Sequence, residues 1–296
     1  MRLFRIASVF CGLAAAPAFI APLSACQPEF VQSAQTVSLT ASEVGNRNRV
    51  ETDEQLRVRN AGTSECNAFL RIARLNTSNP SPERSLSITS SGQTLDILPS
   101  DISAASLSSD LFVPAIPGGG AGSRPVPLRI GFPVEWGIAS GFSSETLLVQ
   151  LIDEAGAVFD ELVLTVNLEV LPTVEMRIVG ATGNNRIAQV NLGALDPRLI
   201  NRSNPFGVRV WSTSSYSVTF ASDNAGALSH QIASDRIDYE LRAAGRLVDL
   251  SGGSPGALGQ NTTALGDYHP LEISVPPFTA QAGEYSDRVV VTVSAG

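Results

Sequence analysis

The sequence contains no lysine and very little histidine, cysteine or methionine. All 20 basic residues are arginine, and two of them lie in the N-terminal segment described below, which leaves 18 basic against 28 acidic residues in the rest of the chain. This acidity argues against nucleic acid or an anionic membrane surface as a partner. Charged residues make up only 16% of the chain, while Ser, Thr, Gly, Ala and Val are abundant. Such a composition favours strands and turns over helix bundles.

The scarcity of catalytic residue types argues against an enzyme. The two histidines, His230 and His269, have no neighbouring Cys or His at metal-ligand spacing. The glycine run 118–120 lacks the strand–helix context and the following lysine of a phosphate-binding loop. The acidic pairs 153–154 and 160–161 flank a hairpin turn, where solvated carboxylates are ordinary. No nucleophile–base pair is recognisable, so we expect no catalytic activity, no cofactor and no metal.

Long apolar runs are also absent, except at the N-terminus. Two early arginines precede an apolar run that extends to about Leu23 and ends in small residues. This pattern is typical of a secretory signal, with cleavage after Ala18 or Ala25. No later stretch is long and apolar enough to span a bilayer. We therefore predict a signal peptide at 1–25 and an exported protein that works outside the reducing cytosol.

The cysteines allow two interpretations. Cys11 lies in the predicted signal, which leaves Cys26 and Cys66 as an even pair in an oxidising compartment. A disulfide between them would close a loop of about 40 residues and stabilise the fold by roughly 3–4 kcal/mol. In the alternative, residues 23–26 form a bacterial lipobox, Cys26 is acylated, and Cys66 stays unpaired.

The remaining chain holds two copies of one pattern. Each copy has a strand, a turn with a glycine close to an aromatic residue and a serine, and another strand, over 126–152 and again over 269–293. Upstream, 94–98 resembles 236–241 at a comparable distance. Short apolar/polar alternations bounded by Gly, Asn, Pro and Ser predict strands in both copies. We therefore predict an all-β protein of two immunoglobulin-like β-sandwich domains, with a boundary near Pro172.

The two copies differ at their ends. The first copy continues through a turn at 153–156 into one more alternating strand, whose core-facing residues are Leu162, Leu164, Val166, Leu168 and Val170. The second copy stops at Gly296, directly after its counterpart of 146–152. We therefore expect the second sandwich, 172–296, to lack its final strand, whereas the first, 26–171, is complete.

A missing strand has a large energetic consequence. Five buried aliphatic side chains contribute on the order of 10 kcal/mol, which is comparable to the stability of a whole domain. The second sandwich is thus predicted to have an open groove and to need a strand from another chain. The edge of this groove is expected along Val289, Val291 and Val293. The alternative is that the second sandwich closes with a different strand order.

The second copy resembles the spore coat protein U-like pilin domain of archaic chaperone–usher pili. The resemblance is carried by 216–228, 237–241 and 282–293, and most specifically by the Gly-Glu-Tyr-Ser-Asp ending at 283–287 followed by an alternating Val/Thr strand. The first copy fits more loosely. Its Cys26 and Cys66 match the disulfide that such domains place near their first strands, and the second copy has no cysteine.

This resemblance implies a set of partners. Subunits of this family are incomplete sandwiches that are held by a periplasmic chaperone, threaded through an outer-membrane usher, and completed by the N-terminal donor strand of a neighbouring pilus subunit. A stalk subunit needs a free donor segment before its first domain. At most 19–25 precedes Cys26 here, which is too short for a full donor strand at about 3.3 Å per residue. We therefore expect a two-domain tip adhesin on the surface of a Gram-negative bacterium.

The first sandwich would then be an adhesive head that attaches the cell to abiotic or host surfaces and promotes biofilm formation. The candidate surface-binding loops carry Phe112, Val113, Ile116, Trp136 and Ile138. Alternatively, these side chains fold back onto the core, as we expect of Trp211. A different class of function also stays open, namely an outer-membrane lipoprotein that is anchored through Cys26 and acts as a binding or structural module.

Overall fold

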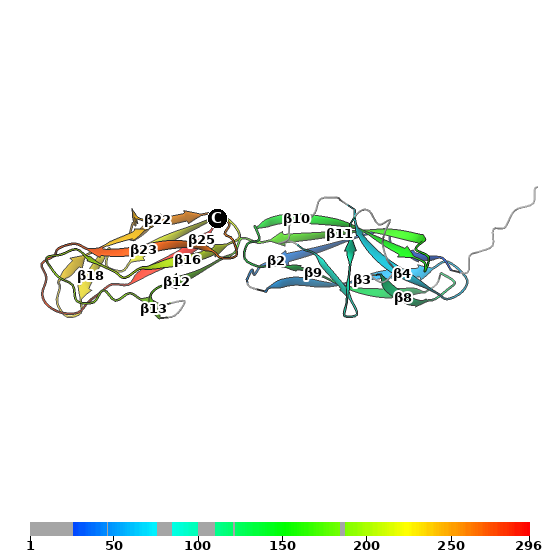
Figure 1. Cartoon of the computed structure of the whole chain (residues 1–296), viewed down its shortest axis with the longest axis horizontal. Coiled ribbons are helices and arrows are strands. Elements are labelled where there is room, and N and C mark those ends of the chain that lie inside the picture. The colour runs from blue at the N-terminus through cyan, green and yellow to red at the C-terminus, as the bar shows by residue number, and fades with distance from the viewer. Residues whose placement is uncertain (1–25, 46, 76–84, 100–109, 121, 184–186) are drawn as a thin grey trace, which may run out of the picture.

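The computed structural model describes residues 26–45, 47–75, 85–99, 110–120, 122–183 and 187–296, with only the backbone described for 252–254. The predicted signal peptide at 1–25 lies outside these residues. Every helix or strand in the described part of the chain is a β-strand, which confirms the predicted all-β fold. None of the described residues forms a helix that could cross a membrane. Figure 1 shows two β-sandwiches placed end to end.

The first sandwich consists of two sheets that enclose one apolar core. One sheet has the order β1 (Pro28–Phe30), β3 (Arg49–Asn60), β9 (Ser123–Pro133), β5 (Ser87–Ser90) and β6 (Gln93–Leu95). The other has the order β2 (Ala34–Ala41), β11 (Val158–Val170), β10 (Gly141–Ile152), β4 (Cys66–Arg74) and β7 (Ile97–Leu98), and β8 (Leu111–Ile116) also pairs with β4.

Strand β11 closes the first sandwich. It runs antiparallel to β10 along its whole length and parallel to β2 on its other side. Its inward side chains are almost fully buried, namely Leu162, Leu164, Val166, Leu168 and Val170. Because successive side chains of a strand point to opposite faces, the alternation in the sequence is what places all five in the core.

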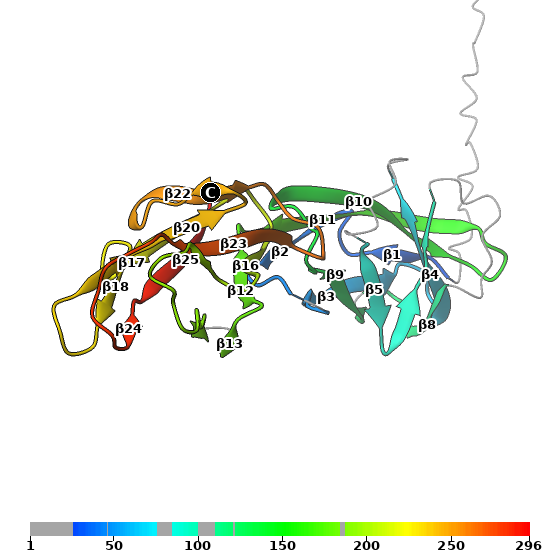
Figure 2. The ribbon, with the colours of Figure 1, turned by 60° about the vertical axis from the view of Figure 1, so that its left-hand side comes forward.

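The second sandwich has a similar but less continuous strand order. Its larger sheet has the order β12 (Val174–Val179), β16 (Phe206–Ser212), β23 (Asp267–Val275), β20 (Glu240–Ala243) and β21 (Arg246–Leu247), and β15 (Asn201–Arg202) also pairs with β23. The opposite side is split into β22 (Ser251–Gly259), β17 (Tyr216–Ser222) and β25 (Val289–Ala295), and into β19 (Arg236–Asp238), β18 (Ala227–His230) and β24 (Tyr285–Ser286). A small hairpin, β13 (Thr182–Gly183) and β14 (Ala188–Gln189), follows β12. Figure 2 shows the chain running from β24 into β25 and back towards the first sandwich.

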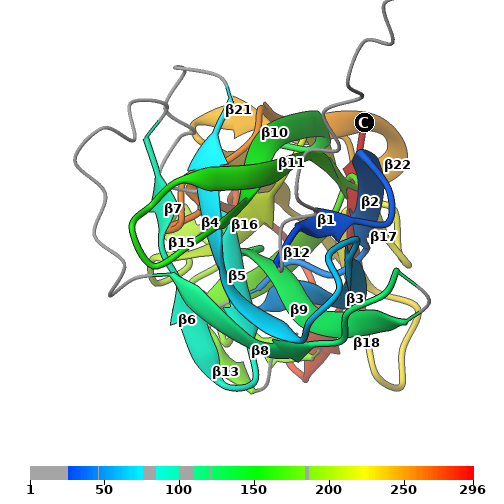
Figure 3. The same ribbon diagram turned by 90° about the vertical axis from the view of Figure 1, so that its right-hand side faces the viewer.

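The joint between the two sandwiches is centred on Thr213, in the turn between β16 and β17. Its side-chain Oγ1 accepts a hydrogen bond from the Thr173 amide at 2.8 Å and lies 3.2 Å from the Leu171 carbonyl. Its own backbone amide donates to Thr173, and its carbonyl accepts from the amide of Ser140 in the first sandwich at 2.6 Å. Trp211 packs against the core of the first sandwich. In Figure 3, which looks along the long axis, the second sandwich lies behind the first.

Candidate strand-binding groove

Strand β25 has a hydrogen-bonded neighbour on one side only. It pairs antiparallel with β17 from Val289 to Ala295, and no described residue pairs with its other edge. In the sequence repeat, β25 is the counterpart of β10, whose two edges are both paired, to β11 and to β4. An unpaired strand edge presents free N–H and C=O groups to any chain that can align with it.

Burial of the inward side chains shows the consequence of the open edge. On β10 the inward residues Leu147, Val149 and Leu151 have no exposed surface. Their counterparts in the repeat are only half-buried, namely Val289, Val291 and Val293. The core of the second sandwich is therefore not closed along β25.

An open groove of about 870 Å³ lies beside β25. Core side chains from both faces of the sandwich line it, among them Phe220, Leu241, Leu271 and Val291. Its opposite wall includes residues 188–195, which follow the small hairpin after β12. The groove thus occupies the position that β11 fills between β10 and β2 in the first sandwich.

The contrast between the two cores supports this description. Among the described residues, three partly buried apolar side chains pack against the first core, Val50, Ile97 and Trp211. Sixteen do so in the second sandwich, including Val190, Leu192, Phe278 and Tyr285 beside the groove. Partly exposed core side chains are unfavourable in water, so this surface favours an apolar occupant.

A polar cluster lies at the end of the groove away from the first sandwich. The Asp287 carboxylate accepts hydrogen bonds from the Tyr239 hydroxyl at 2.6 Å and from Ser222 Oγ at 2.5 Å. Burial, reinforced by the Asp287 carboxylate, raises the pKa of Tyr239, so its phenol keeps the proton that it donates. Both Tyr239 and Asp287 line the groove.

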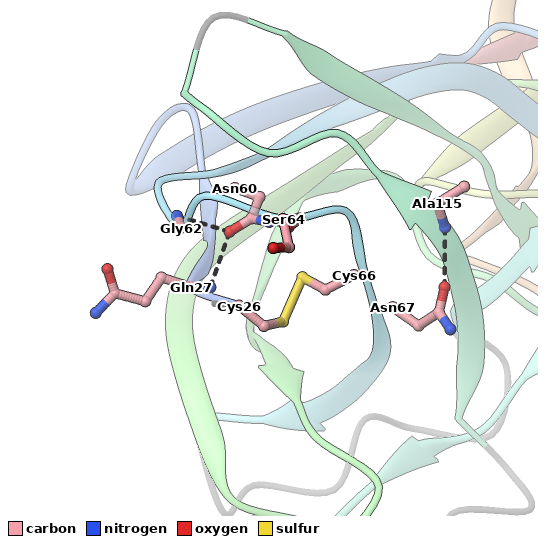
Figure 4. The surroundings of a disulfide bond; sticks show 8 residues. All are labelled: Cys26, Gln27, Asn60, Gly62, Ser64, Cys66, Asn67 and Ala115. Carbon is pink, nitrogen blue, oxygen red and sulfur yellow. Dashed lines mark hydrogen bonds between the residues drawn. A yellow bond between two sulfur atoms is a disulfide. The ribbon is translucent and has the colours of Figure 1, made fainter. Parts of the chain in front are cut away.

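The predicted disulfide between Cys26 and Cys66 is present. It lies away from the second sandwich, because the start of β4 pairs with the end of β10 at Ile152, whereas Ser140 before β10 lies at the joint. Figure 4 shows that buried Asn60 links the chain segments beside the disulfide. Its Oδ1 accepts hydrogen bonds from the backbone amides of Gln27 and Gly62, both at 2.8 Å. The sulfur of Cys26 is bonded to Cys66 in this disulfide. A lipid anchor would be attached to the same sulfur, so the two cannot occur together.

The prediction of exposed apolar loops is wrong for four of its five residues. Val113 and Ile116 are buried because they belong to β8 and face inward against β4. Trp136 and Ile138 are also buried. Only Phe112 is exposed, at 48%, with its ring centroid 5.3 Å from that of Phe69.

Trp136 and Ile138 also lie at the end of the first sandwich that faces the second. The turn that holds them lies at the joint, since a Cβ on Gly137 would be 3.4 Å from the Ala264 amide of the second sandwich. Both side chains nevertheless belong to the core cluster of the first sandwich.

The groove wall at 188–195 is absent from the sequence-based prediction. A signal was available, because Ala188, Val190 and Leu192 alternate with polar residues like the core face of a strand. No group of His, Cys, Asp or Glu side chains in the described ranges is arranged to hold a metal ion.

No family model matches the chain, so its resemblance to spore coat protein U-like domains stays a prediction. None of the curated proteins matches it either.

Several solved structures of adhesins resemble the fold loosely. The CsuC–CsuE chaperone–tip adhesion subunit pre-assembly complex, from the archaic chaperone–usher Csu pili of Acinetobacter baumannii, is similar at 14% identity and a TM-score of 0.43, over 91% of this chain and 99% of that chain. A mutant of the CFA/I adhesin CfaE of enterotoxigenic E. coli is similar at 11% identity and a TM-score of 0.40, over 89% of this chain and 92% of that chain. The CupB6 tip adhesin from Pseudomonas aeruginosa is similar at 11% identity and a TM-score of 0.36, over 90% of this chain and 92% of that chain. At such low TM-scores these likenesses assign neither a family nor a function.

Proposed function

We propose that the second sandwich accepts a β-strand from another polypeptide along β25, and that the protein is the tip adhesin of a chaperone–usher pilus. The observation that carries this proposal is the open groove beside the unpaired edge of β25, lined by core side chains. Strand addition to an exposed edge joins main-chain hydrogen bonds with the burial of alternate side chains.

The first sandwich supplies an internal template for the accepted strand. There β11 lies antiparallel to β10, with Leu164 opposite Leu147 and Leu162 opposite Val149. By the repeat, a strand in the groove of the second sandwich would run antiparallel to β25 and place apolar residues opposite Val289 and Val291. The groove therefore favours an extended segment with alternate apolar residues over a globular or strongly charged partner.

The remaining partners follow from the same groove. A sandwich with an exposed core needs protection before assembly, which is the role we assign to a periplasmic chaperone, and an outer-membrane usher would then exchange that protection for the neighbouring subunit's strand. The first sandwich, whose own β11 completes it, would be the head that contacts an abiotic or host surface. The Cys26–Cys66 disulfide favours this proposal over a lipoprotein anchored at Cys26.

Amide hydrogen exchange on the exported protein tests the proposal, with a synthetic peptide of residues 158–170 as the probe. The groove-facing amides of β25 should exchange much faster than the amides of β10, and the peptide should slow them. The control is a peptide of the same composition in which neighbouring residues have swapped places, so that the apolar side chains point to the opposite face of the strand. This control peptide should not slow the exchange of the β25 amides. Exchange in β25 as slow as in β10 without any peptide would contradict the open groove.

A further inference from the structure

Asp287 lies where the chain passes from one sheet of the second sandwich to another. Ser286, just before it, ends β24 and pairs with β18, whereas Val289, two residues later, begins β25 and pairs with β17. The last residue pair of the β17–β25 ladder is Ser222 with Val289. Asp287 therefore stands at the point where the acceptor edge begins.

The carboxylate of Asp287 accepts four hydrogen bonds at this point of the chain. One oxygen accepts from the hydroxyls of Tyr239 and Ser222, and the other accepts from the backbone amides of Arg288 at 2.8 Å and Asn224 at 3.2 Å. The donors come from the end of β17, from the turn after it and from the chain just before β20. Hydrogen bonds to an ionised acceptor are stronger than neutral ones, so this cluster ties the start of β25 to two other segments, the end of β17 with its turn and the chain at Tyr239.

We propose that Asp287 is a positioning residue for strand acceptance: its carboxylate fixes β25 at the lip of the groove, so that an incoming strand finds the edge from Val289 to Ala295 already aligned. This inference rests on the proposed function. It goes beyond that function by naming the side chain that aligns β25 for the incoming strand. It also predicts that the affinity for this strand and the stability of the fold can be changed separately.

A second Tyr–Asp pair in the same sandwich provides a matched control. The Tyr216 hydroxyl donates to Asp267 at 2.9 Å, and burial with the nearby carboxylate raises the pKa of this tyrosine as well. Unlike the Tyr239–Asp287 pair, neither Tyr216 nor Asp267 is among the residues that line the groove. Tyr216 pairs with Ala295, so this second pair lies at the opposite end of β25 from Asp287 and outside the groove. Loss of the Asp267 carboxylate should therefore lower stability and leave the part of the edge that lines the groove, at Val289 and Val291, unchanged.

The experiment measures the affinity of the exported protein for a labelled peptide of residues 158–170, at a temperature at which every variant is folded by circular dichroism. Asp287→Ala should weaken binding by about tenfold or more, a loss of about 1.4 kcal/mol. Asp287→Asn should bind within about threefold of the wild type, because its remaining oxygen can still accept from both backbone amides and the two hydroxyls can turn to accept from its amide group. Asp267→Ala should lower the melting temperature and leave the affinity unchanged.

Tyr239→Phe removes one of the four hydrogen bonds to the Asp287 carboxylate and leaves that carboxylate in place. This variant therefore remains informative if Asp287→Ala does not fold. It should weaken binding by a smaller factor, about threefold. Wild-type affinity in both Asp287→Ala and Tyr239→Phe would overturn the inference, as would an equal loss in Asp267→Ala. If the wild-type protein itself neither binds the peptide nor shows faster exchange in β25 than in β10, the proposed function fails, which is a separate outcome.

Discussion

At the scale of single residues, His269 connects the two faces of the second sandwich. It lies on β23 and its Nε2 is 2.7 Å from the hydroxyl of Tyr216 on the opposite sheet. Burial lowers the pKa of His269, and the nearby Asp267 carboxylate only partly opposes this effect. The folded protein therefore holds the imidazole neutral under conditions in which the unfolded chain begins to protonate it.

This difference predicts acid sensitivity of the second sandwich. The unfolded histidine titrates near 6.5, above the folded value, so the unfolded state binds more protons as the pH falls through this range. The stabilising contribution is complete above about pH 6.5 and decreases as the pH falls from there towards the lowered folded pKa. Melting curves between about pH 7.5 and pH 5 should show a larger loss of stability in the wild type than in His269→Gln. Equal slopes in the two proteins would contradict this assignment.

At the scale of elements, β10 and β25 form a natural comparison, because they carry valine at equivalent positions of the repeat. Val149 is covered by β11 and has no exposed surface, whereas Val291 lines the groove and is half-buried. Val149→Ala should destabilise the first sandwich by about 2 kcal/mol, from two buried methyl groups and the cavity that they leave.

Val291→Ala should destabilise the protein by less than about 1 kcal/mol when the groove is empty. Its effect should grow when the peptide of residues 158–170 is bound, since the peptide would then cover the side chain. Chemical denaturation of both variants, with and without peptide, measures these differences. Equal losses in the two variants without peptide would show that the second core is as closed as the first.

The elements also show what the sequence can and cannot predict. The alternation at Leu162–Val170 was sufficient to predict β11 and its buried face, because one property of the chain, period 2, determines which side chains point inward. The same rule does not distinguish a strand from an apolar loop when the run is as short as Leu111–Ile116, and so β8 was not recognised. Trp136 belongs to a core whose other members lie far from it in the sequence, and no local pattern records such contacts. Similarly, the cluster around Asp287 joins Ser222, Tyr239 and Asp287 from positions far apart in the sequence.

At the scale of the whole molecule, the joint should hold the two sandwiches in one orientation. Thr213 is 1% exposed, and its Oγ1 accepts a hydrogen bond from the part-buried amide of Thr173. Thr213→Val keeps the side-chain shape and removes this hydrogen bond, which costs about 1 kcal/mol and loosens the turn.

Residual dipolar couplings give the measurement. The wild-type sandwiches should fit a single alignment tensor, and those of Thr213→Val should need two. Thr219→Val, the same substitution on the outward side of β17, is the control and should behave as the wild type. Two tensors in the wild type itself would show that the hydrogen bonds at Thr213 do not fix the joint.

The direction of the strands has a mechanical consequence. In Figure 1, β10, β11 and β25 all run nearly along the long axis of the molecule. Hydrogen bonds between antiparallel strands are perpendicular to the strands. A pull along the axis would therefore load the bonds of the β10–β11 ladder in shear, all at once, instead of opening them one after another. A strand seated against β25 would meet tension in the same way, so its rupture force would grow with the number of paired residues.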